Sequence, residues 1–369
     1  MHKLVSLIIA VMAFGLVTVP AMALERDLIR VAVGRSTGSV TLQGDGMLAL
    51  RESGTALVLP PSATIVPGHG HLLLDGAPYR RLRVTAAGPV RLNGTSYRGV
   101  LEVLPQGNGI LVVDELPLEE YLVGVINSEI SSTWPMEAIK AQAVIARTYA
   151  VAKRQERRNA LYHLESTVMD QAYDGSDQED SRAARAVHET VGQVLTYHGA
   201  VIQAYYHASC GGKTEDAANV WGGVSPPYLK GVDCQYCAKS PASRWELSMP
   251  LSKLETALRL PGITDIREGP RNNRGRLKTV ILTTARGAVT MLATRFRMTV
   301  GSTVIRSTNF TVRVIGGVAL FSGLGYGHGV GLCQWGAKQR ALAGFSYSEI
   351  LSYYYPGTEL RTLPADAGR

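Results

Sequence analysis

The sequence has no run of basic residues that would form an arm or a stripe, although Lys and Arg outnumber Asp and Glu by 38 to 30. We therefore expect no nucleic-acid partner. Charged residues make up 18% and apolar residues 46%, which excludes a disordered tail and a coiled coil. The 39 glycines follow no Gly-X-Y period, so a collagen-like chain is excluded and a β-rich, loop-rich fold is favoured.

Beyond the N-terminus, no stretch reaches the roughly 18 apolar residues of a membrane span. The N-terminus itself has the features of an export signal: Lys3, an apolar run from Leu4 to Val19, and the small-x-small pattern Ala21-Met22-Ala23. Pro20 interrupts the helix that an uncleaved anchor would need. We expect residues 1–23 to be a cleaved signal peptide. The mature chain is then exported to the periplasm, the extracellular space or the cell wall, without a membrane span.

Two kinds of local pattern follow each other along the chain. Short β-branched or alternating segments separated by Gly, Pro and Asn-Gly turns fill residues 24–110, and predict an antiparallel β module. Helical patterns begin at Leu116-Pro117, and antiparallel strands and C-terminal helices follow. We therefore predict an α+β fold with domains at 24–110 and 111–360, and a tail at 361–369. One helix is expected in the strand-rich stretch 245–315, near Leu251–Leu260.

The clearest helix runs from Met136 to about Arg158 and is preceded by a polar loop over residues 127–135. Its first half is apolar nearly all round, which predicts burial on most sides. Lys140 and Arg147 interrupt this pattern on one face. Burying them unpaired would cost several kcal/mol. They are expected either to form structural ion pairs or to orient a carboxylate that faces the substrate. A second helix over 178–191 is expected to open at Ser176-x-x-Glu179.

Three of the four cysteines cluster with a histidine, as His207-x-x-Cys210 and Cys234-x-x-Cys237. Two such pairs separated by a loop are a usual source of four tetrahedral zinc ligands. A zinc ion held by all four residues would be structural, because no ligand position remains for water. The alternative is a disulfide from Cys210 to Cys234 or Cys237, which an oxidising compartment permits.

Glycine recurs at every second position from Gly323 to Gly331. If the segment is extended, these glycines present bare backbone that a flat ligand or another chain segment can approach closely. The spacing matches neither a dinucleotide-binding nor a phosphate-binding loop.

Several separated motifs resemble one family, that of stage II sporulation protein D and the LytB amidase enhancers. The resemblance covers roughly residues 95–360. The motifs are Leu116-Pro-Leu-Glu-Glu-Tyr-Leu-x-Gly-Val125, Ser128-Glu129, Trp134-Pro-x-Glu-Ala-x-Lys-Ala-Gln-Ala143, Ala146-Arg-Thr-Tyr-Ala150, His207-x-Ser-x-Gly-Gly-Lys-Thr214 and Gly325-Tyr-Gly-His-Gly-Val-Gly-Leu-x-Gln-Trp-Gly-Ala337. The chain departs from the family in Cys333, where Ser is common and where we expect little effect. It also carries the pair Cys234 and Cys237, which only a subset of the family has and which makes zinc more plausible.

The resemblance implies that the protein acts on peptidoglycan. Some members are lytic transglycosylases that prefer glycan strands stripped of peptide stems, and others are enhancers of an N-acetylmuramoyl-L-alanine amidase. The family's catalytic acid matches Glu129. We expect its pKa to be raised by burial beside Trp134, Tyr121 or the glycine segment. The expected substrate contacts are Lys213, Tyr326, His328, Gln334 and Trp335. A non-catalytic, glycan-binding enhancer remains the alternative, and a structural envelope protein is a weaker one.

Overall fold

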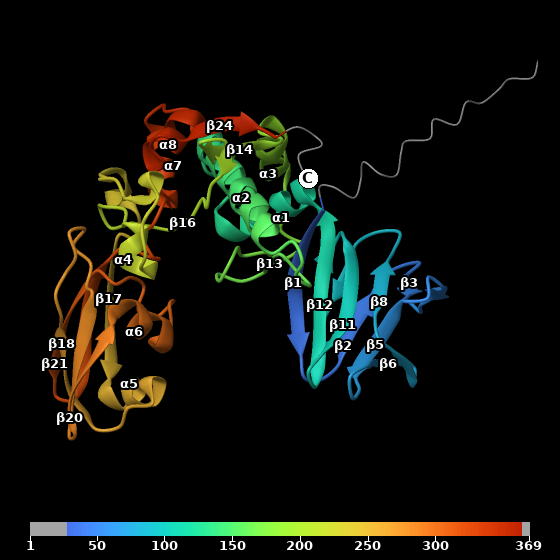
Figure 1. The fold of residues 1–369 in the computed structure, drawn as a ribbon, viewed down its shortest axis with the longest axis horizontal. Coiled ribbons are helices and arrows are strands. Elements are labelled where there is room, and N and C mark those ends of the chain that lie inside the picture. The colour runs from blue at the N-terminus through green and yellow to red at the C-terminus, as the bar shows by residue number, and fades with distance from the viewer. Residues whose placement is uncertain (1–27, 364–369) are drawn as a thin grey trace, which may run out of the picture.

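The computed structural model describes residues 28–363. Two layers of strands lie at one end of the molecule, helices occupy the middle, and a second strand-rich unit lies at the other end (Figure 1). This mixture of helices and mostly antiparallel strands confirms the α+β prediction. The predicted signal peptide, residues 1–23, lies outside the described residues. None of the helices in residues 28–363 is long and apolar enough to cross a membrane.

The N-terminal region forms two sheets, of strand order β13-β1-β12-β11-β8-β3-β4 and β10-β9-β2-β5-β6-β7. Their pairing is antiparallel except between β1 and β13. Alternate residues are buried, as in β8, where Leu82 and Val84 point inward. Both sheets contribute to one apolar cluster, which also includes helices α1 to α3. The strands are β1 Leu28–Ser36, β2 Val40–Gln43, β3 Leu48–Arg51, β4 Ala56–Val58, β5 Ser62–Pro67, β6 Leu72–Leu74, β7 Ala77–Tyr79, β8 Leu82–Thr85, β9 Val90–Leu92, β10 Thr95–Tyr97, β11 Val100–Gln106, β12 Gly109–Pro117 and β13 Leu164–Glu165.

Three helices follow this module: α1 Leu118–Glu129, α2 Met136–Glu156 and α3 Ser181–Glu189. Helix α2 is buried over most of its length, as its composition predicts. Two predicted boundaries were wrong. Helix α1 continues through residues 127–129, which had been expected in a loop. Helix α3 is capped by Asp180, whose carboxylate accepts two backbone N–H groups, so the Ser176-x-x-Glu179 pattern does not open it.

The rest of the central part combines short strands and helices around a second apolar cluster. Strands β16 and β23 pair in parallel and bring residues 206–207 beside residues 332–333. Strand β24 pairs with β14, so residues 361 and 362, expected in the tail, belong to a sheet. The elements are β14 Gln193–Tyr197, β15 Ala200–Val201, β16 Tyr206–His207, α4 Ala217–Trp221, β23 Leu332–Cys333, α7 Gln334–Leu342, α8 Tyr347–Tyr354 and β24 Glu359–Thr362, with short 3-10 turns at Pro227–Leu229 and Tyr236–Lys239.

Residues 244–324 form a unit with an apolar cluster of its own, which includes Trp245, Phe296, Phe310 and Phe321. Two helices occur in this unit, one more than the sequence predicted. The additional helix, α6, buries only Ala293 and Phe296, and so short an apolar stripe is a weak helical signal. The elements are β17 Arg244–Pro250, α5 Leu251–Leu258, β18 Ile263–Glu268, β19 Thr279–Thr284, β20 Gly287–Leu292, α6 Ala293–Val300, β21 Phe310–Ile315 and β22 Val318–Leu324.

The glycine-rich segment leaves the end of this unit and is not extended, because Gly325, Gly327, Gly329 and Gly331 all have positive φ. A Cβ on Gly327 would lie 2.7 Å from the Cβ of His207, and one on Gly331 would meet the carbonyl oxygen of Tyr205. The bare backbone is therefore approached by another segment of the chain, residues 205–211.

Candidate functional site

A cleft of about 760 Å³ lies between the helical centre of the molecule and the 244–324 unit. Its walls come from segments far apart in sequence: the end of α1, helices α2, α4 and α6, strand β16 and the glycine-rich segment. The residues that line the cleft include Glu129, Lys153, Arg157, Asp170, Tyr205, Tyr206, His207, Trp221, Thr294, Arg295, Arg297, Ser302, Thr303, Tyr326, His328 and Gln334.

Glu129 is the last residue of α1 and borders this cleft. One carboxylate oxygen accepts the backbone N–H of Ala172 at 2.8 Å, and the side chains of Tyr206 and Gln334 contact the carboxylate. Burial raises the pKa of Glu129, and these hydrogen bonds oppose the shift only in part. Within residues 28–363 no Lys, Arg or His forms an ion pair with it. The Glu129 carboxyl group therefore keeps its proton to a higher pH than an ordinary glutamate does, and it borders the cleft.

The predicted substrate contacts divide into two groups. Tyr326, His328 and Gln334 line the cleft, as does Glu129. Lys213 and Trp335 are not among the lining residues. Trp335 packs against Trp134 at a ring distance of 5.1 Å, with the ammonium of Lys338 over both rings. Lys213 is exposed and its backbone pairs with that of Asp233.

Two histidines of the cleft are neutral near pH 7. His328 accepts the backbone N–H of Val330 at Nδ1, at 3.0 Å, and burial lowers its pKa to about 3. His207 lies with its Nδ1 3.1 Å from the carbonyl oxygen of Val330, and burial holds its pKa well below the ordinary value. Both imidazoles are therefore poor proton donors, and Glu129 is better suited than either histidine to act as an acid.

Aromatic rings that the sequence did not single out complete one wall. Trp221 is 52% exposed, and its ring centroid lies 4.5 Å from that of Tyr205 and 5.3 Å from that of His328. Rings of this kind suit the apolar faces of sugars. The sequence did contain a local pattern for the short helix that carries Trp221. Asp216 is a favoured residue for the cap at its start, and Gly222 ends the helix directly after Trp221.

Lys140 and Arg147 lie outside the cleft lining and form ion pairs. Arg147 is buried and makes two hydrogen bonds to the Glu119 carboxylate, at 2.7 and 2.6 Å. Lys140 pairs with Glu189 at 2.7 Å and with Glu137 at 3.1 Å. Of the two alternatives left open by the sequence, this geometry is that of a structural ion-pair network.

The four cysteine sulfur atoms, those of Cys210, Cys234, Cys237 and Cys333, lie within 4.8 Å of one another and are all buried. The predicted ligand set of His207, Cys210, Cys234 and Cys237 differs from this group in one member, because the fourth sulfur is that of Cys333 and no His207 nitrogen belongs to the group. The pairing of β16 with β23 brings Cys333 in from more than 120 residues away. Cys333, which was expected to have little effect, therefore supplies one of these four sulfur atoms.

The cysteine cluster has the donor chemistry of a zinc site. Four thiolates about 2.3 Å from a tetrahedral zinc ion lie roughly 3.8 Å apart, which fits sulfur atoms gathered within 4.8 Å. Backbone N–H groups of Cys210 and Gly336 each point at the Cys333 sulfur at 3.3 Å, and such donors stabilise a thiolate.

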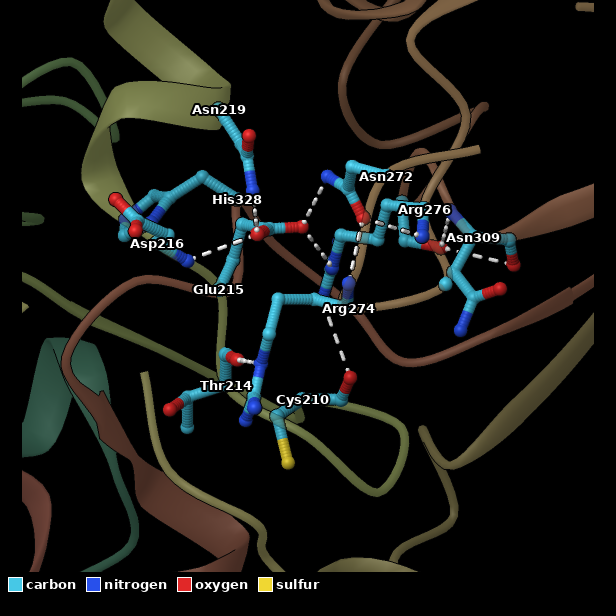
Figure 2. A network of polar contacts seen from close by, with 12 residues as sticks. Cys210, Thr214, Glu215, Asp216, Asn219, Asn272, Arg274, Arg276, Asn309 and His328 are labelled. Carbon is cyan, nitrogen blue, oxygen red and sulfur yellow. Dashed lines mark hydrogen bonds and ion pairs between the residues drawn. The ribbon is translucent and has the colours of Figure 1, made fainter. Parts of the chain in front are cut away.

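A network of polar contacts joins the 244–324 unit to the central part of the molecule (Figure 2). The guanidinium of Arg276 is buried, donates to the carbonyl oxygens of Cys210 and Gly327 at 3.1 and 3.3 Å, and faces the buried carboxylate of Glu215 at 3.7 Å. Glu215 in turn accepts side-chain N–H groups from Asn219 at 2.8 Å and Asn272 at 2.9 Å. The network joins Asn272 and Arg276 of this unit to the segments that carry Cys210, Glu215 and Gly327.

The fold and the cleft together define an α+β protein with one protonatable carboxyl group among aromatic side chains. A family model described as SpoIID, stage II sporulation protein, matches residues 106–197. Stage II sporulation protein D of Bacillus amyloliquefaciens is 31% identical over 268 residues, which are 67% of this chain and 75% of that protein. The amidase enhancer of Bacillus subtilis is 30% identical over 292 residues, 65% of this chain but 40% of that protein.

An uncharacterized protein of Brachyspira hyodysenteriae is 36% identical over 271 residues, 73% of each chain. These similarities extend far beyond the segment that the family model matches. The chain belongs to the family of stage II sporulation protein D and the amidase enhancers.

Proposed function

We propose that the protein is exported and acts on peptidoglycan as a lytic transglycosylase. It cleaves glycan strands, with a preference for stripped ones, and leaves 1,6-anhydro ends. The observation that carries this proposal is the position of Glu129 in the cleft, with a raised pKa and no ion-pair partner in the described part of the chain. Family membership supports it, because the Ser-Glu pair of the family falls at this residue.

The chemistry needs a single carboxyl group. Protonated Glu129 gives its proton to the bridging oxygen, and the bond from that oxygen to C1 of the sugar breaks. The C6 hydroxyl oxygen then forms a bond to C1, and the Glu129 carboxylate takes the hydroxyl proton. Since the sugar supplies its own nucleophile, the second carboxylate that hydrolytic glycosidases use is not required. Tyr206 and Gln334 hold the Glu129 carboxyl group in place during both transfers.

The test is the digestion of stripped glycan strands, followed by mass analysis of the products. The wild-type protein should produce ends that are one water lighter than hydrolysis products. Glu129→Gln should lower the rate by roughly 100-fold or more, the usual contribution of a general acid. Its fold should be kept, because the amide oxygen can still accept the N–H of Ala172. Glu120→Gln, an exposed change on the same helix, is the matched control.

The second candidate function is that of a glycan-binding enhancer of a cell-wall amidase, and the similarity to the Bacillus subtilis amidase enhancer favours it. In that case the purified protein would bind glycan and stimulate an added amidase, but release no anhydro ends. Unchanged activity in Glu129→Gln, or no cleavage by the wild type, would contradict the enzymatic proposal.

We also propose that Cys210, Cys234, Cys237 and Cys333 hold one structural zinc ion. Metal analysis of protein prepared without chelator should find about one zinc per chain, and Cys333→Ser should lower this content. A matched control is His207→Gln, which should keep the metal, because the ring lies outside the sulfur cluster. Absence of zinc together with the loss of a pair of free thiols would favour the disulfide instead.

A further inference from the structure

One wall of the cleft that Glu129 borders carries positive charge that the described part of the chain does not neutralise. Helix α6 and the loop after it supply Arg295, Arg297, Thr294, Ser302 and Thr303 to this wall. The cations of the other wall are paired: Lys153 with Glu156 at 2.8 Å and Arg157 with Asp170 at 2.7 Å.

Arg297 is the unusual member of this wall. Its guanidinium donates to the carbonyl oxygens of Arg306 at 3.3 Å and Ser302 at 3.2 Å, and no carboxylate of residues 28–363 lies within ion-pair distance. Burial, together with the nearby charge of Arg276, lowers the pKa of Arg297 to about 10, so the side chain still carries its charge near pH 7. A cation that is largely removed from water and lacks a counter-ion is costly to maintain.

Arg295 lies two residues away on the same helix and also borders the cleft, but it is exposed. The pair therefore combines one guanidinium that is held by backbone carbonyl groups with one that is exposed to solvent. Guanidinium groups bind carboxylates through paired N–H donors. Hydroxyl groups of Thr294, Ser302 and Thr303 on the same wall suit the hydroxyl and ether oxygens of a sugar.

We infer that Arg297, assisted by Arg295, binds a carboxylate of the glycan substrate. This inference rests on the proposed function and names the substrate group that the α6 wall recognises. In a glycan of the peptidoglycan type, the lactyl group of each muramic acid bears a carboxylate only where the peptide stem is absent, since the stem is attached there as an amide. The α6 wall thus gives the cleft a physical means to select stripped strands. An amide-cleaving reaction must act first to supply them.

The test measures binding rather than cleavage, so that it can be separated from the catalytic proposal. In the Glu129→Gln background, the affinity is measured for a stripped glycan strand and for the same strand with its lactyl carboxyls converted to methylamides. A chitin oligosaccharide of equal length, which has no lactyl group, is the third probe. We expect the charged strand to bind about 10-fold or more tightly than both neutral probes, the usual value of a charge-assisted hydrogen bond. The preference should weaken with added salt.

Arg297→Gln and Arg295→Gln should each reduce this preference and leave the affinity for the chitin oligosaccharide nearly unchanged. Arg313→Gln, an exposed change on β21 of the same unit, is the matched control and should keep the preference. Should Arg297→Gln fail to fold, the effect of Arg295→Gln and the salt dependence of the affinity of the Glu129→Gln protein test the inference instead. Equal binding of all three probes by the Glu129→Gln protein would overturn the inference while leaving a glycan cleft intact. Binding of none would overturn the proposed function as well.

Discussion

Replacing Arg147 by Met should destabilise the protein without acting on the cleft chemistry. The side chain is buried and makes four hydrogen bonds: two to Glu119, and one each to the carbonyl oxygens of Gln193 and Val187. Removal of one partner of a buried ion pair costs about 3 to 5 kcal/mol. Because the Glu119 side chain is 35% exposed and can regain part of its hydration, we expect the lower end, about 3 kcal/mol.

For a cooperative unit of about 200 residues, this loss corresponds to a fall of about 6 to 12 °C in melting temperature. The measurement is a thermal scan of the wild type and the variant by circular dichroism. Lys140→Met is the matched control on the same helix. Its partners Glu137 and Glu189 are about one-third exposed, so its loss should cost at most about 1 kcal/mol. Equal destabilisation by both changes would refute this reasoning. So would a loss of glycan cleavage in Arg147→Met at full stability.

Three further results are expected. Glycan cleavage should decline as the pH rises through the raised pKa of Glu129, since the protonated form is the acid, and a pH–rate profile that stays flat up to pH 9 would contradict this. Asp114 is buried beside the Tyr173 hydroxyl, and burial raises its pKa to about 7. Its ionisation opposes folding, so the free energy of unfolding should fall by up to about 4 kcal/mol as the pH rises from 4 through 7. Urea titrations should find this component absent in Asp114→Asn, and an unchanged pH dependence would count against it. Gly331→Ala should destabilise the protein by at least about 1 kcal/mol, because φ is +71° and the new Cβ would meet the Tyr205 carbonyl; an unchanged melting temperature would contradict the close approach.

Local sequence patterns predicted the structure correctly where the residues of a single helix or strand were sufficient to determine it. The apolar first half of α2 predicted its burial, and the short alternating strands predicted the N-terminal sheets. In the structure, Ser346 and Glu349 form a capping box at the start of α8. The Ser176-x-x-Glu179 pattern failed, because Asp180 lies nearer to the first turn and takes the N–H groups that a cap must satisfy.

The candidate site contains residues that local sequence patterns predicted and residues that they did not predict. Glu129, Tyr326, His328 and Gln334 were chosen from motifs and all border the cleft. Lys213 was chosen in the same way, yet it is exposed and outside the cleft lining. Arg297 and Trp221 carried too weak a signal, because α6 buries only two residues and α4 is a single short turn.

By itself, the sequence determined the α+β class, the long buried helix and a carboxyl group placed just before it. These follow from side-chain periodicity and turn chemistry, which act over a few residues. Only the tertiary structure decided that the Cys333 sulfur lies with those of the other three cysteines, and that arginines of α6 line the cleft that Glu129 borders. Such pairings join residues far apart in the sequence, since Cys333 lies 96 positions after Cys237, its nearest partner along the chain. Their distances are set by how sheets and helices pack, through contacts such as β16 with β23 and Arg276 with Glu215, and no local pattern encodes them.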